Sequence, residues 1–166
     1  MALWIRQNEP LGMFLETGER TAAVDVMQKV WTGDWPPYQA PQIQSLRLNS
    51  EEAPRSIEGA VNQVLRAEVH ATESDDHLIS WRVREEVPTA LQSDGGDFEP
   101  TPPTVEAVVG TQNRQFHFQL SEPGQYRLFC QIDTPHDSSA VANIPFLIKA
   151  KPQKLTRLFN LSLIHI

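Results

Sequence analysis

Hydrophobic and polar residues alternate along much of the chain between residues 42 and 150, which is the pattern of half-buried strands. Turn-forming residues separate seven short segments of this kind. They are 43–48, 64–71, 78–83, 105–109, 115–120, 126–132 and 140–148. Residues 88–104 are rich in Gly, Asp and Pro, so we expect a long excursion there instead of a core strand.

The count and spacing of these segments predict a mainly β fold, an immunoglobulin-like antiparallel β-sandwich of about seven strands. Trp81 has the position of the core tryptophan on the central strand of such a sandwich, and Tyr126 that of its corner tyrosine. The shared core is expected to contain inward-facing residues from several strands, namely Val69, Trp81, Phe118, Leu128 and Ile144.

Before the strands the hydrophobic period changes to that of a helix. Residues 19–32 are predicted to form one amphipathic α-helix, because apolar residues recur there at helical spacing. These residues are Ala23, Val24, Met27, Val30 and Trp31. Thr17 or Thr21 can cap the start, and Gly33 is placed to end the helix.

One amphipathic helix cannot bury its own stripe. We therefore expect its apolar face either to be partly exposed or to fold back on the sandwich through Trp31 and Trp35. Residues 1–18 are expected to pack poorly and to lack sheet partners.

Composition narrows the function classes. Thirteen prolines in 166 residues argue against a helical bundle. The net charge is −7 without a basic cluster, which excludes the electrostatic signature of a nucleic-acid partner. No apolar run is long enough to span a membrane. Cys130 is the only cysteine, so no intrachain disulfide is possible, and we interpret it as a small buried hydrophobe.

Several segments resemble the C-terminal region of bacterial TIM-barrel glycoside hydrolases near glycoside hydrolase family two. The most specific are W-T-G-x-W-P at 31–36 and A-N-I-P-F at 142–146. The matching stretches are 3–14, 19–41, 73–83, 95–103 and 122–148. In that family the last strand and helix of the barrel run into an immunoglobulin-like domain.

The resemblance implies a domain division. Residues 1–33 would be the end of a TIM barrel, 34–41 a proline-rich linker and 42–150 the sandwich. Residues 151–166 would be a tail, artefactual in part, because LSLIHI from Leu161 onward resembles a translated sequencing adaptor. The start MALWIRQNEPLG has no features of a signal peptide. The parent enzyme would be periplasmic or extracellular, whereas the location of this fragment stays open.

The resemblance also implies that the chain by itself is not an enzyme. A glycosidase needs two carboxylates beside the scissile bond, and the family carries both on earlier barrel strands. We therefore expect no catalytic residue and no cofactor. In the parent enzyme Trp4 would either stack on the substrate, since strand ends of a barrel face the substrate, or pack in the core, and in this chain alone core packing is expected.

Other candidate sites have an ordinary structural interpretation. Trp31, Trp35 and Tyr38 could bind a glycan, but are expected to pack at a domain junction. Glu73, Asp75 and Asp76 could bind calcium, but are expected to form a solvated turn. The histidines, including His117 and His136, show no metal-ligand spacing, so no metal is expected.

Three functions remain open. The first is a structural accessory domain of a carbohydrate-active enzyme, with the barrel of the same protein as its partner. The second is a carbohydrate-binding module that presents an exposed row of aromatic residues to a polysaccharide. The third is a cadherin-like or polycystic-kidney-disease-like interaction domain of the cell surface, which would need a ligand cage at residues 73–77.

Overall fold

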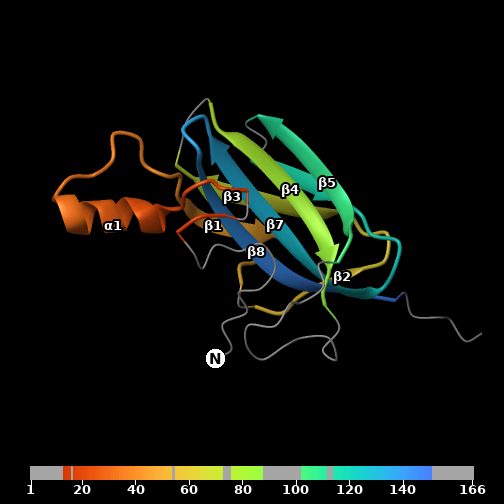
Figure 1. The fold of residues 1–166 in the computed structure, drawn as a ribbon. Coiled ribbons are helices and arrows are strands. Elements are labelled where there is room, and N and C mark those ends of the chain that lie inside the picture. The colour runs from red at the N-terminus through yellow and green to blue at the C-terminus, as the bar shows by residue number, and fades with distance from the viewer. Residues whose placement is uncertain are drawn as a thin grey trace, which may run out of the picture.

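A computed structural model describes residues 13–15, 17–53, 55–72, 76–87, 102–111 and 114–150. One helix, α1 (Ala22–Thr32), precedes eight strands (Figure 1). The strands are β1 (Ile43–Leu48), β2 (Ile57–Ala60), β3 (Leu65–Ala71), β4 (Leu78–Glu85), β5 (Thr104–Thr111), β6 (Gln115–Phe118), β7 (Gly124–Thr134) and β8 (Ser138–Lys149). No helix within these described ranges is long and apolar enough to cross a membrane.

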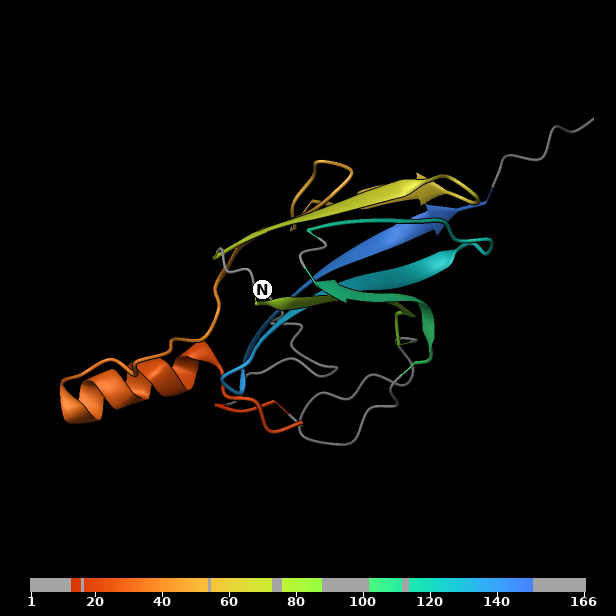
Figure 2. The same cartoon turned by 90° about the horizontal axis from the view of Figure 1, so that it is seen from above.

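The strands form two sheets, with the orders β1-β3-β6 and β2-β8-β7-β4-β5. Figure 2 shows the sheets as two layers, with α1 extending away from one end. Every paired strand is antiparallel to its neighbour except β2, which runs parallel to β8. The predicted fold class is thus confirmed: a mainly β, immunoglobulin-like sandwich preceded by one amphipathic helix.

The buried side chains lie where the two sheets face each other. All five predicted core residues are buried, and Trp81 on β4 has no exposed surface. Its ring stacks on Phe116 of the opposite sheet, with 5.9 Å between the ring centroids. In β3 every second residue from Leu65 to Ala71 is buried, so the alternation in the sequence matches the two faces of the strand.

Tyr126 is a corner tyrosine, as predicted. Its hydroxyl donates a hydrogen bond of 3.1 Å to the backbone oxygen of Glu122, four residues upstream. In antibody domains the second cysteine of the inter-sheet disulfide follows this tyrosine by two residues. Leu128 takes that place here and is fully buried, so apolar packing stands in for the covalent link.

Strand β2 was not predicted, and it corrects the expectation of purely antiparallel sheets. The chain leaves the first sheet after β1, and β2 then pairs with β8, Ile57 lying opposite Phe146. Four residues are too few for a clear alternation. Gly59 also contributes no side chain to such a pattern. The packing requires glycine here, because a Cβ would lie 3.0 Å from the side chain of Leu65 and 3.1 Å from that of Ile148.

Helix α1 begins later than residue 19 because Thr21 is its N-cap. The Thr21 backbone is extended, and its hydroxyl accepts a hydrogen bond of 3.3 Å from the Ala23 amide. Gly33 ends the helix with φ at +84°, and its amide donates to the carbonyl of Lys29 at 3.0 Å. Of the two proposed caps, Thr21 is therefore the right one.

The segment before the helix is paired, contrary to expectation for its described residues. Phe14 forms an antiparallel bridge with Arg20, which forms a parallel bridge with Ser138 at the start of β8. Met13 and Phe14 are nonetheless exposed, which agrees with the prediction that this segment packs poorly. Residues 1–12 lie outside the described ranges.

Candidate docking site

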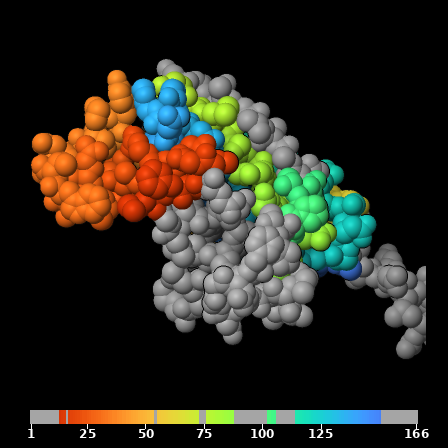
Figure 3. Space-filling model, in the orientation of Figure 1, coloured from red at the N-terminus to blue at the C-terminus, as the bar shows by residue number. Residues whose placement is uncertain are grey.

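Helix α1 turns its apolar residues away from the sandwich. Val30 exposes 70% of its surface and Trp31 72%, and Val26 is exposed as well. The α1 stripe consists of Ala23, Val26, Met27, Val30 and Trp31, at the spacing of one helix face. Figure 3 shows α1 standing out from the body of the molecule, so the first of the two alternatives for the helix, partial exposure, is the one observed.

The polar side of the helix holds it to the rest of the domain. Asp25 is only 3% exposed, and its Oδ2 accepts a hydrogen bond of 2.5 Å from the Ala40 amide. Residues 34–41 run back beside α1 (Figures 1 and 2), and Pro36 within them is buried. The linker therefore occupies the side of the helix opposite the α1 stripe.

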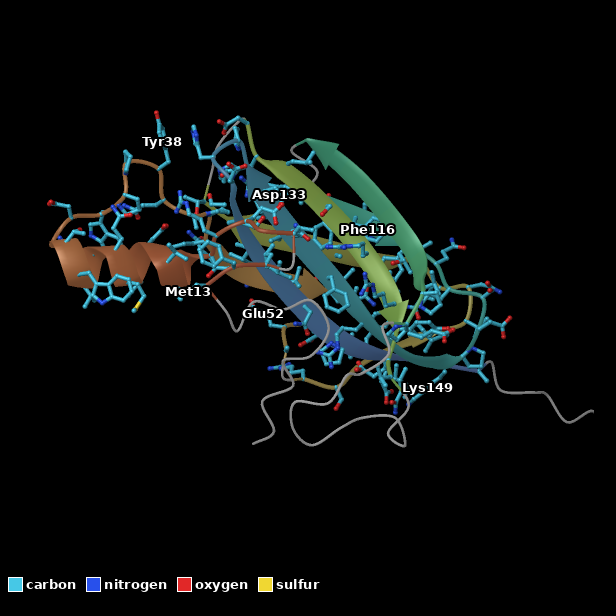
Figure 4. All side chains as sticks on the ribbon, viewed as in Figure 1. Met13, Tyr38, Glu52, Phe116, Asp133 and Lys149 are labelled. Carbon is cyan, nitrogen blue, oxygen red and sulfur yellow. The ribbon has the colours of Figure 1, made fainter. Side chains whose placement is uncertain are left out.

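Two further aromatic residues extend the exposed surface onto the linker. Trp35 and Tyr38 are both exposed. The Tyr38 ring stacks on His136 at the tip of the β7–β8 hairpin, with 3.7 Å between centroids. Figure 4 places Tyr38 beside α1, at the opposite end of the sandwich from Lys149. These aromatics lie on the helix and linker rather than in a row on one sheet.

A shallow groove of about 480 Å³ lies where α1 meets the sandwich. Small side chains of the helix start and of β8 line it, among them Ala22, Ala23, Ala140 and Ala142. Ala23 belongs both to this groove and to the α1 stripe. The groove and the stripe are thus adjacent parts of one exposed surface.

No three His, Cys, Asp or Glu side chains of the described residues lie close enough together to hold a metal ion. Cys130 is fully buried, and desolvation raises the pKa of its thiol to about 12, so it is no nucleophile. Trp4, Glu73 and Asp75 lie outside the described residues, whereas Asp76 is exposed.

The sequence predicted the helix and its apolar stripe, but not every residue of the stripe and not the groove beside it. The predicted stripe included Val24, which is half-buried, and left out Val26. A wheel at 100° per residue places Val26 beside Val30 and carries that signal. The groove and the buried Asp25 could not be found, because both depend on contacts between segments distant in the sequence.

No family model matches the chain, and no curated protein matches it. Among solved structures it is similar to the soluble domain of PmoD from Methylocystis sp. ATCC 49242 (Rockwell), with a TM-score of 0.39 and 11% identity. That match covers 70% of this chain and 95% of the other. A likeness this weak supports no conclusion about function.

Proposed function

We propose that the chain is a non-catalytic, structural accessory domain of a TIM-barrel glycoside hydrolase, and that the α1 stripe packs against the barrel. The observation that carries the proposal is the outward apolar face of α1, with Val30 and Trp31 about seven-tenths exposed. Burying each such side chain is worth about 1.5–3 kcal/mol. A helix that buries Asp25 and exposes Trp31 is arranged to contact something beyond the sandwich.

The sequence resemblance supplies the identity of the partner. The W-T-G-x-W-P segment at 31–36 corresponds to the end of the last barrel helix and its linker. Helices of a TIM barrel form an outer ring whose apolar sides face the strands. The α1 stripe would then be the barrel-facing side of that helix, and the linker and sandwich would contact its polar side.

The test is a longer chain obtained by extending the reading frame upstream. In that chain Val30→Glu with Trp31→Glu is expected to lower the free energy of unfolding by about 3 kcal/mol or more, because charges would be buried at the contact. In the 166-residue chain the same pair of changes is expected to shift it by less than about 0.5 kcal/mol, since both sites are exposed. Urea unfolding followed by circular dichroism measures both.

The matched control is Val64→Glu with Val105→Glu, two exposed apolar residues at the end of the sandwich remote from α1. These changes should affect both chains equally. The proposal fails if the upstream frame encodes no barrel, or if the helix variant is as neutral in the longer chain as in the shorter one.

The 166-residue chain is also expected to hydrolyse no glycoside, because the proposal places both catalytic carboxylates on earlier strands of the barrel. A panel of aryl glycosides, incubated with the purified chain and monitored for released phenolate, tests this. Turnover that is lost on a single Asp or Glu substitution in the chain would refute it. The longer chain is the positive control.

A carbohydrate-binding module is the second candidate, favoured by the exposure of Trp31, Trp35 and Tyr38. Aromatic rings can stack on sugar rings, but these three lie on two different elements. Affinity electrophoresis in gels containing soluble polysaccharides separates the two functions. Retardation that Trp35→Ala abolishes would favour glycan binding, whereas unretarded migration on every polysaccharide favours the structural role.

A further inference from the structure

A partly buried ion pair, with Asp25 buried and Arg20 half-buried, joins the helix, the linker and the β7–β8 hairpin. The Arg20 guanidinium donates through Nη1 to Oδ1 of Asp25, and through Nη2 to the backbone oxygen of Tyr38 at 2.5 Å. The other oxygen of Asp25 accepts from the Ala40 amide. Both oxygens of the Asp25 carboxylate thus accept a hydrogen bond, one from the charged Arg20 guanidinium and one from a backbone amide of the linker.

The backbone of Arg20 attaches the same group to the sandwich. Its amide donates to the carbonyl of Asp137 at 2.9 Å, and its carbonyl accepts from the Ser139 amide at 3.0 Å. Arg20 therefore extends the start of β8 by one bridge while its side chain reaches the helix and the linker. The stacked rings of Tyr38 and His136 reinforce the same junction.

We infer that Arg20 and Asp25 form a latch that fixes the direction of α1 relative to the sandwich. A buried ion pair is weak evidence for stability, but its fixed geometry can specify one arrangement among several. An alternative arrangement is available, because the α1 stripe could fold back and bury itself on the sandwich. The latch opposes that collapse by tying the polar side of the helix to the linker and to β8.

The consequence rests on the proposed function: the latch would hold the α1 stripe open for the barrel and set the angle between barrel and sandwich. The latch itself concerns this chain alone. It makes the two parts one rigid unit instead of two domains on a flexible linker.

Spin labels test the latch in the 166-residue chain. Asp34→Cys beyond the helix end and Glu122→Cys on a turn of the sandwich provide two exposed sites, in a Cys130→Ala background. We expect a narrow distribution of label distances in this parent, and a broad or shifted one after Arg20→Met or Asp25→Asn. Arg20→Met keeps the backbone bridge, so it isolates the contribution of the guanidinium.

Hydrogen exchange provides a second measurement. The Ala40 amide should exchange about tenfold faster or more in Asp25→Ala, because it loses a charged acceptor. Amides of β4 and β7 should keep their protection. Glu52→Gln, which breaks the exposed ion pair of Arg47 and Glu52, is the matched control and should change neither the distances nor the Ala40 rate.

Unchanged distances and an unchanged Ala40 rate would overturn the latch. General loss of protection in β4 and β7 would overturn it too, because the pair would then support the whole fold instead of the junction. Neither result depends on a barrel, so the latch and the proposed function can fail separately. The first is decided in this chain, and the second in the longer one.

Discussion

Trp81→Ala is expected to lower the free energy of unfolding by about 3–5 kcal/mol. The indole has no exposed surface and lies on β4, which is paired on both sides by β5 and β7. Removing it leaves a cavity in the shared core and deletes the stacking contact with Phe116. Urea unfolding followed by far-ultraviolet circular dichroism measures the loss.

Trp31→Ala is the matched control, since it deletes the same side chain from an exposed position. It is expected to change the free energy of unfolding by less than about 0.5 kcal/mol. Equal losses at the two positions would mean that the helix is packed on the sandwich in solution. A small loss at Trp81 would contradict the core assignment.

Cys130 in the folded chain is expected to react with iodoacetamide at pH 8 roughly a thousandfold more slowly than in the urea-unfolded chain. Only the thiolate reacts, and desolvation raises the pKa of this thiol from 9.0 to about 12. Its lack of exposed surface slows the reaction further. A Cys130→Ala chain that carries His117→Cys, at an exposed position of β6, is the control and should react at similar rates folded and unfolded.

The same pKa shift makes stability depend on pH. Below about pH 9 the Cys130 thiol is protonated in both the folded and the unfolded chain, so its contribution to the free energy of unfolding is fully present. Above it the unfolded chain releases the proton first, and the free energy of unfolding falls by about 1.4 kcal/mol per pH unit until about pH 12.

Cys130→Ala is the control for this pH dependence and should lack that part of the decline. Burial also raises the pKa of the Tyr126 hydroxyl, so a smaller decline of the same sign remains in the variant. Identical pH profiles for the two chains, or rapid alkylation of the folded chain, would contradict the buried thiol.

Much of the sandwich could be predicted because buried and exposed positions alternate along the sequence of its strands. Seven of the eight strands were located, since alternation along one strand is a local property. The core positions of Trp81 and Leu128 follow from the same alternation. β2 was missed because four residues, one of them Gly59, give no clear period, and its parallel pairing with β8 depends on where the chain crosses between sheets.

The sequence by itself determined seven of the strands, the end of α1 at Gly33 and the existence of an apolar stripe on the helix, and it narrowed the N-cap to Thr17 or Thr21. Only the tertiary structure decided which way that stripe faces. Hydrophobic periodicity gives the relative angles of side chains around a helix axis but contains no information on what lies beside the helix. That choice is made by Asp25 and Arg20, whose bonds to Ala40, Tyr38 and the β8 backbone bury the polar side and leave Trp31 exposed.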